Sequence, residues 1–82
     1  MSDAKAQEGD LPGEILVHLD VLLARRKMRS KELADRIGVS EQALSMIKTG
    51  RIKGVRFSTL IALCDVLDCQ PGELLEFRRT AD

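Results

Sequence analysis

The chain of 82 residues is long enough for one small domain and leaves no room for a separate domain that senses a small molecule. It carries 13 basic and 13 acidic residues, so its net charge by itself indicates neither a nucleic-acid nor a membrane partner. No apolar run approaches the roughly 18 residues that cross a bilayer, and the polar N-terminal segment lacks the apolar core of a signal peptide. We therefore expect a cytoplasmic protein without a membrane partner, and no small-molecule effector is evident.

The N-terminal segment shows no apolar periodicity, and we predict a disordered tail over residues 1–13 and one domain over residues 14–79. The β-branched pattern from Ile15 to Leu19 favours a short strand. Asp20 stands where a helix N-cap is favoured, and Leu19, Leu22 and Leu23 give the following helix an apolar side.

A second helix is predicted from Ser30, which can cap its first turn. Leu33, Ala34 and Ile37 follow at the three- and four-residue spacing that places them on one helical face. Gly38 stands where the chain must turn, because a residue without a Cβ atom easily takes the left-handed conformation that ends a helix. The pattern predicts about two turns of helix followed by a tight turn.

A third helix is predicted immediately after that turn. Val39 is an apolar residue after the glycine, Ser40 offers a second N-cap, and Leu44 and Ile47 give the helix a buried side, with Gly50 placed to end it. The remaining positions are predicted to face outward: Glu41, Gln42, Ser45, Met46, Lys48 and Thr49.

Basic residues gather around these two helices. Between Arg25 and Arg56 there are ten basic and three acidic residues, a local balance of +7, so the rest of the chain carries −7. The ten are Arg25, Arg26, Lys27, Arg29, Lys31, Arg36, Lys48, Arg51, Lys53 and Arg56. Such clustering predicts one positively charged surface, which suits the phosphate backbone of a nucleic acid.

The C-terminal third is predicted to be a basic loop, a helix, a short helical turn and a strand. Ser58 is the expected N-cap of the helix, with Phe57 packing back on its first turn. Pro71 can start the short turn, and Leu75 and Phe77 continue in an extended pattern. The apolar face of the helix is expected to consist of Leu60, Ile61, Leu63, Cys64 and Leu67.

The two terminal strands are each marginal alone. They can pair with each other or with the strands of a second subunit, and the sequence leaves both arrangements open.

The segment from Ser30 to Ile47 resembles the helix-turn-helix of the Cro and lambda-repressor family. The matches are Leu33-Ala34, Gly38-Val39, and Leu44 with Ile47, and the resemblance covers roughly residues 19–77. It implies a mainly α fold, a five-helix lambda-repressor-like DNA-binding domain with short terminal β-strands. The chain departs from the family in having Ser30-Lys31 where a glutamine often makes a phosphate contact.

The resemblance implies a sequence-specific DNA-binding transcriptional regulator, a repressor that inserts the helix beginning near Glu41 into the major groove of double-stranded DNA, acting as a homodimer. Gln42 can hydrogen-bond adenine, and Glu41 can either accept from cytosine or stabilise the helix N-terminus. Ser45 and Met46 are the other candidates for base contacts. The candidates for phosphate contacts are Lys31, Ser40, Lys48, Arg51, Lys53 and Arg56.

The sequence offers little for other functions. His18 is the only histidine and is interpreted as an ordinary strand position, while Cys64 and Cys69 lack the further ligands of a metal site and are expected to be reduced core thiols. No cofactor, metal or catalytic residue is therefore expected, and an enzyme is disfavoured. The alternative function is a protein-interaction module, such as an antitoxin or adaptor, for which an exposed apolar face on the third helix would be evidence.

Overall fold

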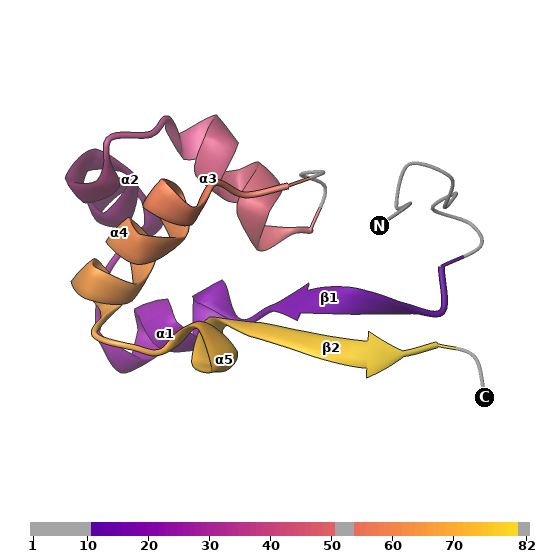
Figure 1. Ribbon diagram of the computed structural model, residues 1–82. Helices are drawn as coiled ribbons and strands as arrows, with labels where there is room; N and C mark the ends of the chain where they lie inside the picture. Colours follow the sequence, from indigo (N-terminus) through magenta and orange to yellow (C-terminus); the bar gives the residue numbers. More distant parts are fainter. Residues whose placement is uncertain (1–10, 51–53, 81–82) are drawn as a thin grey trace.

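The computed structural model describes residues 11–50 and 54–80. In chain order its elements are β1 (Gly13–Val17), α1 (Leu19–Arg25), α2 (Ser30–Ile37), α3 (Glu41–Lys48), α4 (Phe57–Leu67), α5 (Pro71–Leu74) and β2 (Leu75–Arg79) (Figure 1). This order confirms the predicted five helices with a short strand at each end. Of the tail predicted over residues 1–13, residues 1–10 lie outside the described residues, and Gly13 already belongs to β1.

The core is built almost entirely from leucines, and each of the five helices supplies at least one of them. Leucine at helical spacing gives each short helix one apolar side, and burying these sides together holds in place helices too short to be stable alone. The fully buried leucines are Leu19, Leu22, Leu33, Leu44, Leu63, Leu67 and Leu74. The described part of the chain holds no buried charged or polar side chain.

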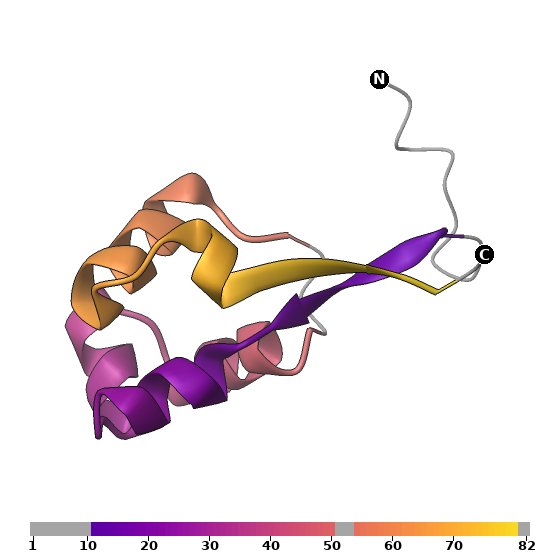
Figure 2. The same cartoon turned by 90° about the horizontal axis from the view of Figure 1, so that it is seen from below.

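The two terminal strands pair with each other as an antiparallel sheet. Val17 lies opposite Leu75, and Ile15 lies opposite Phe77. Both views show the strands extending from one end of the helical body as a twisted arm (Figures 1 and 2). Of the two arrangements that the sequence left open, the fold adopts pairing within one chain.

The junction of β1 and α1 differs from the sequence prediction. The strand ends at Val17 rather than at Leu19, because the His18 N–H donates to Leu74 O at 2.8 Å and the chain then turns into α1. His18 occupies the N-cap position, and Asp20 lies within the first turn of the helix. The predicted strand boundary and the predicted Asp20 cap were therefore wrong.

His18 is also more than an ordinary strand position. Its Nε2 lies 2.6 Å from Glu76 Oε1, on the strand that follows the helices. The sequence did not indicate this partner, because His18 and Glu76 are 58 positions apart.

Two further caps were misplaced, one by one residue and the other by two. The N-cap of α2 is Arg29 and that of α4 is Arg56, so Ser30 is the first residue of its helix and Ser58 the second of its own. Neither helix has a side-chain hydrogen bond at its cap.

The apolar face of α4 was also assigned wrongly in part. Leu63 and Leu67 are buried as expected, but Ile61 is 67% exposed. Phe57 is 80% exposed and does not pack against the first turn. Because α4 is apolar on most of its circumference, its periodicity did not reveal which side meets the core.

Candidate nucleic-acid interface

The turn between α2 and α3 has the geometry that the glycine predicted. Gly38 has φ of 77°, in the left-handed region, and its N–H donates to Ala34 O at 2.9 Å. The Val39 N–H donates to the same carbonyl at 3.0 Å. These bonds satisfy the end of α2 and redirect the chain into α3 within two residues. The small Ala34, whose carbonyl accepts both bonds, is itself buried.

The start of α3 is fixed by Ser40. The Ser40 Oγ accepts a hydrogen bond from the Ala43 N–H at 3.0 Å, with the serine backbone extended. This confirms the predicted cap. At the other end, the Thr49 N–H and the Thr49 Oγ1 both donate to Ser45 O at 3.0 Å.

One side of α3 is buried, and the opposite side is open to solvent. Leu44 and Ile47 are buried against the core. The four residues predicted to contact bases are all exposed, and within the described residues their side chains make no hydrogen bond or ion pair: Glu41, Gln42, Ser45 and Met46. Their spacing places them on one side of the helix, and we call this set the exposed face of α3.

The exposed face of α3 suits a DNA groove. It presents a carboxylate, an amide, a hydroxyl and a thioether on a capped helix of eight residues, about 12 Å long by the helical rise. A major groove about 12 Å wide admits such a helix, and these groups can hydrogen-bond base edges or contact a thymine methyl. Met46 is 43% exposed and is the only large apolar side chain on this face.

Comparison with known proteins agrees with this geometry. Residues 18–79 match the Cro/C1-type HTH DNA-binding domain family. The chain belongs to the Cro/C1-type helix-turn-helix family. It is also similar to the uncharacterized HTH-type transcriptional regulator YozG of Bacillus subtilis (strain 168), with 47% identity over 68 residues that cover 83% of this chain and 81% of YozG.

Solved structures share the fold of this Cro/C1-type domain. The transcriptional regulator VanUg superposes with a TM-score of 0.70 at 22% identity, covering 92% of this chain and 99% of VanUg. A putative DNA-binding protein from Bacteroides fragilis superposes with a TM-score of 0.66 at 22% identity, covering 76% of this chain and 98% of that protein. Family and relatives together identify the chain as a DNA-binding transcriptional regulator in which α2 and α3 form the helix-turn-helix.

The basic residues around the helix-turn-helix of this Cro/C1-type domain do not all form one exposed positive surface. Lys31 and Arg56 are exposed and have no ion-pair partner among the described residues. Arg51 and Lys53, two further candidates for phosphate contacts, lie outside the described residues. Lys48 is partly buried, with its Nζ 3.2 Å from Asp20 Oδ1.

Arg25 and Arg26, which contributed to the predicted basic cluster, are held by the C-terminal half of the domain. Arg26 donates from Nε to Leu67 O at 2.8 Å and from its terminal nitrogen to Asp68 O at 2.9 Å, at the end of α4. Arg25 lies 3.7 Å from the Glu73 carboxylate. The run of positive charge in the sequence therefore overestimates the number of cations that are free to contact DNA. The sequence did not indicate this, because 41 residues separate Arg26 from the carbonyl that it satisfies.

The described residues, 11–50 and 54–80, contain no cluster of three metal-ligating side chains, and Cys64 and Cys69 are free thiols. Among these residues no helix is long and apolar enough to span a bilayer.

Proposed function

We propose that the protein is a repressor that occupies an operator as a homodimer and blocks transcription, with no chemical step. The observation that carries this proposal is the exposed face of α3. Its four polar or polarisable side chains have no hydrogen-bond or ion-pair partner among residues 11–50 and 54–80, and they stand on a capped and packed helix. A bacterial or phage operator is accessible in the cytoplasm, and we infer that the protein acts there.

Within this proposal Gln42 is the principal base contact. Its amide nitrogen can donate to N7 of adenine while its amide oxygen accepts from the N6 amino group, in one bidentate contact. Glu41 precedes it in the first turn, where a carboxylate either accepts from a cytosine amino group or interacts with the positive end of the helix dipole. Ser45 and Met46 lie one turn further along and would contact the next bases.

Phosphate contacts are proposed for the cations that flank α3 and for its cap. Lys31 and Arg56 are exposed, and Ser40 stands at the N-terminus of α3, where a hydroxyl and free N–H groups can donate to an anion. Arg51 and Lys53 are added from the sequence alone. Lys48 already has an anionic partner in Asp20, which competes with phosphate for its charge.

A homodimer is proposed because two copies related by a two-fold axis would present two α3 helices to successive major grooves, about 34 Å apart on one side of the duplex. An operator for such a dimer is a palindrome. This symmetry also supplies affinity, since a single helix of eight residues contacts few bases.

The experiment begins with selection of bound sequences from random duplex DNA, followed by binding measurements on the selected operator and a scrambled duplex. Gln42→Ala should reduce the preference for the operator by about 1–3 kcal/mol and leave binding to the scrambled duplex nearly unchanged. Ser58→Ala, which changes an exposed residue on α4, is the control and should leave the preference intact. Equal preferences in the wild type and Gln42→Ala would remove Gln42 from the interface.

A second measurement tests the phosphate contacts. Arg56→Ala should weaken binding to both duplexes and reduce the slope of log affinity against log salt by about one. Binding of the wild-type protein that does not depend on salt would contradict any phosphate contact and favour the alternative of a protein-interaction module.

A further inference from the structure

Two thiols lie together at the end of α4, away from the exposed face of α3. Cys64 and Cys69 are the only cysteines of the chain, and both are free. Cys69 is buried in the core, and the half-buried Cys64 packs against the same core cluster. The proposed recognition of DNA uses neither side chain.

The backbone at the end of α4 brings these two residues together. Asp68, the first residue after the helix, has φ of 50°, in the left-handed region. The Cys69 N–H donates to Cys64 O at 3.0 Å, and the Asp68 N–H donates to Asp65 O at 3.3 Å. This pair of bonds is the Schellman ending of a helix, in which the side chains at the two ends of the outer bond commonly touch. The spacing of the two cysteines is therefore the one that this turn brings into contact.

The separation of the two backbones also suits a disulfide. The 3.0 Å hydrogen bond and the covalent bonds on either side of it hold the Cα atoms of Cys64 and Cys69 within about 7 Å of each other. Disulfides usually join Cα atoms that are about 4.4–6.8 Å apart, and pairs beyond about 7 Å need a movement of the backbone. The turn thus meets the distance requirement for a bond between the two sulfurs while it keeps its hydrogen bonds.

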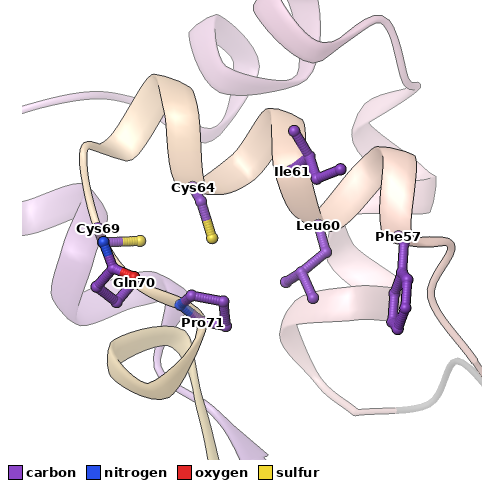
Figure 3. Close-up of a pocket in the computed structure, with 7 residues that line it drawn as sticks. All are labelled: Phe57, Leu60, Ile61, Cys64, Cys69, Gln70 and Pro71. Carbon is purple, nitrogen blue, oxygen red and sulfur yellow. The ribbon is translucent and has the colours of Figure 1, made fainter.

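The two side chains face the same space. Figure 3 shows the Cys69 sulfur directed toward the Cys64 side chain, whose own sulfur points into the hollow lined by Leu60 and Pro71. Burial, and after it the neighbouring Cys64 thiol, raises the pKa of Cys69 to about 11, which agrees with a short distance between the sulfurs. Because Cys64 is half-buried and borders the hollow, a reagent in solution reaches it before Cys69.

We propose that Cys64 and Cys69 form a reversible disulfide within one chain, with a low-molecular-weight disulfide as the oxidant, and that the oxidised domain is more stable than the reduced one. The structure describes the reduced form. In a reducing compartment such a bond is transient and follows the redox state of its surroundings. The proposal depends neither on the operator nor on a homodimer.

The oxidation consists of two exchange steps, written here for glutathione disulfide. Cys64 loses its proton, and its thiolate attacks one sulfur of the oxidant, which releases one glutathione thiolate and leaves a mixed disulfide on Cys64. Cys69 then loses its proton and attacks the Cys64 sulfur, which releases the second glutathione thiolate. The two protein thiols give up two electrons and two protons, and one glutathione disulfide becomes two glutathione thiols.

The disulfide would stabilise the turn to which α1 is attached. Arg26 donates to Leu67 O at 2.8 Å and to Asp68 O at 2.9 Å, and both carbonyls lie between the two cysteines in sequence. A covalent bond across this segment restricts the unfolded chain, whereas the folded turn already has the required approach. By linkage, folding favours the disulfide by the same factor by which the disulfide favours folding.

Equilibration in glutathione redox buffers tests the proposal on the wild-type protein alone, once folded and once unfolded in urea. Alkylation of the remaining thiols followed by mass spectrometry gives the fraction oxidised. The equilibrium constant for the disulfide within one chain should be about tenfold or more larger in the folded protein. Without urea, the melting temperature of the oxidised protein should exceed that of the reduced protein by about 5 °C or more.

A variant with the second thiol moved by one residue is the matched control. Asp68→Cys in a Cys69→Ala background keeps two thiols at a similar spacing, but the side chain at position 68 is 91% exposed and points away from the core. The constant measured in urea should stay similar to that of the wild type, and most of the advantage of the folded state should disappear. Circular dichroism checks that the variant is folded.

Two outcomes would overturn the proposal, and neither needs the variant. One is an equilibrium constant in the folded wild-type protein that is no larger than in urea, because the folded turn would then not favour the bond. The other is a main product in which glutathione stays on Cys64 or in which disulfides join separate chains. Either result would leave the two thiols as core packing alone.

Discussion

Lys48, in the last turn of α3, lies with its Nζ 3.2 Å from the Asp20 carboxylate of α1. The pair joins the helix that we propose to read DNA to the first helix of the domain. It also places a negative charge beside a cation proposed to contact phosphate, and only one of these two anions can be the main partner of Lys48 at a time.

Asp20→Asn should therefore strengthen binding to all duplexes by up to about fivefold, since an exposed ion pair is worth about 0.2–1 kcal/mol and its loss frees Lys48. Binding measured at several salt concentrations checks this. In a Lys48→Met background the same change should have a smaller effect, as in a double-mutant cycle. Glu14→Gln, which breaks the exposed Glu14–Arg78 pair on the sheet, is the control for removing one negative charge. Tighter binding of similar size in that control would show that only net charge matters.

We expect the Ser40 hydroxyl to have two separable roles, as the cap of α3 and as a phosphate contact. Ser40→Ala should destabilise the domain by about 0.5–2 kcal/mol, because the Ala43 N–H loses its acceptor. For a domain of this size the melting temperature falls by about 4–8 °C per kcal/mol, so thermal unfolding detects the change. Ser40→Asp keeps a capping oxygen and should retain stability, but its charge repels phosphate and should weaken DNA binding. Unchanged DNA affinity in Ser40→Asp would place Ser40 away from the backbone of DNA.

Gly38 is expected to be intolerant of side chains for a conformational reason alone. A Cβ atom there would meet nothing within 4 Å, yet the residue has φ of 77°. Gly38→Ala should cost about 1–2 kcal/mol, and Gly38→Asn should cost less, because asparagine enters the left-handed region more readily. Gly72→Ala is the matched control, since its Cβ position is equally open and its φ is ordinary. Denaturant unfolding should show a loss of stability in Gly38→Ala and none in Gly72→Ala.

Cys69 gives the domain a pH dependence in the alkaline range. Burial, with a further contribution from the neighbouring Cys64 thiol, raises the pKa of Cys69 from 9.0 to about 11. Between these values the unfolded chain loses the proton that the folded chain retains, so the unfolded state binds fewer protons and stability falls as pH rises from about 9 to about 11. Unfolding free energies measured across this window should decline, and Cys69→Ala should remove that part of the decline. At pH 8 a thiol reagent should modify Cys64 before Cys69, because the thiolate of Cys69 is scarce.

The sequence by itself determined the helix-turn-helix. Ala34, Gly38 and Ser40 act through hydrogen bonds and backbone conformations within four residues, and the spacing of Leu44 and Ile47 alone defines the buried side of α3. Interactions between residues so close in the chain can be deduced from the sequence, so the turn, the cap and the exposed face could be predicted together.

Only the tertiary structure decided the partners that are distant in sequence. His18 meets Glu76, Arg26 satisfies the end of α4, and Lys48 meets Asp20, and no spacing rule predicts such contacts. The exposure of Phe57 and Ile61 was equally hidden, because a helix that is apolar around most of its circumference can bury any of its sides. The choice of side depends on where the other helices lie, and that is settled by packing of the whole chain.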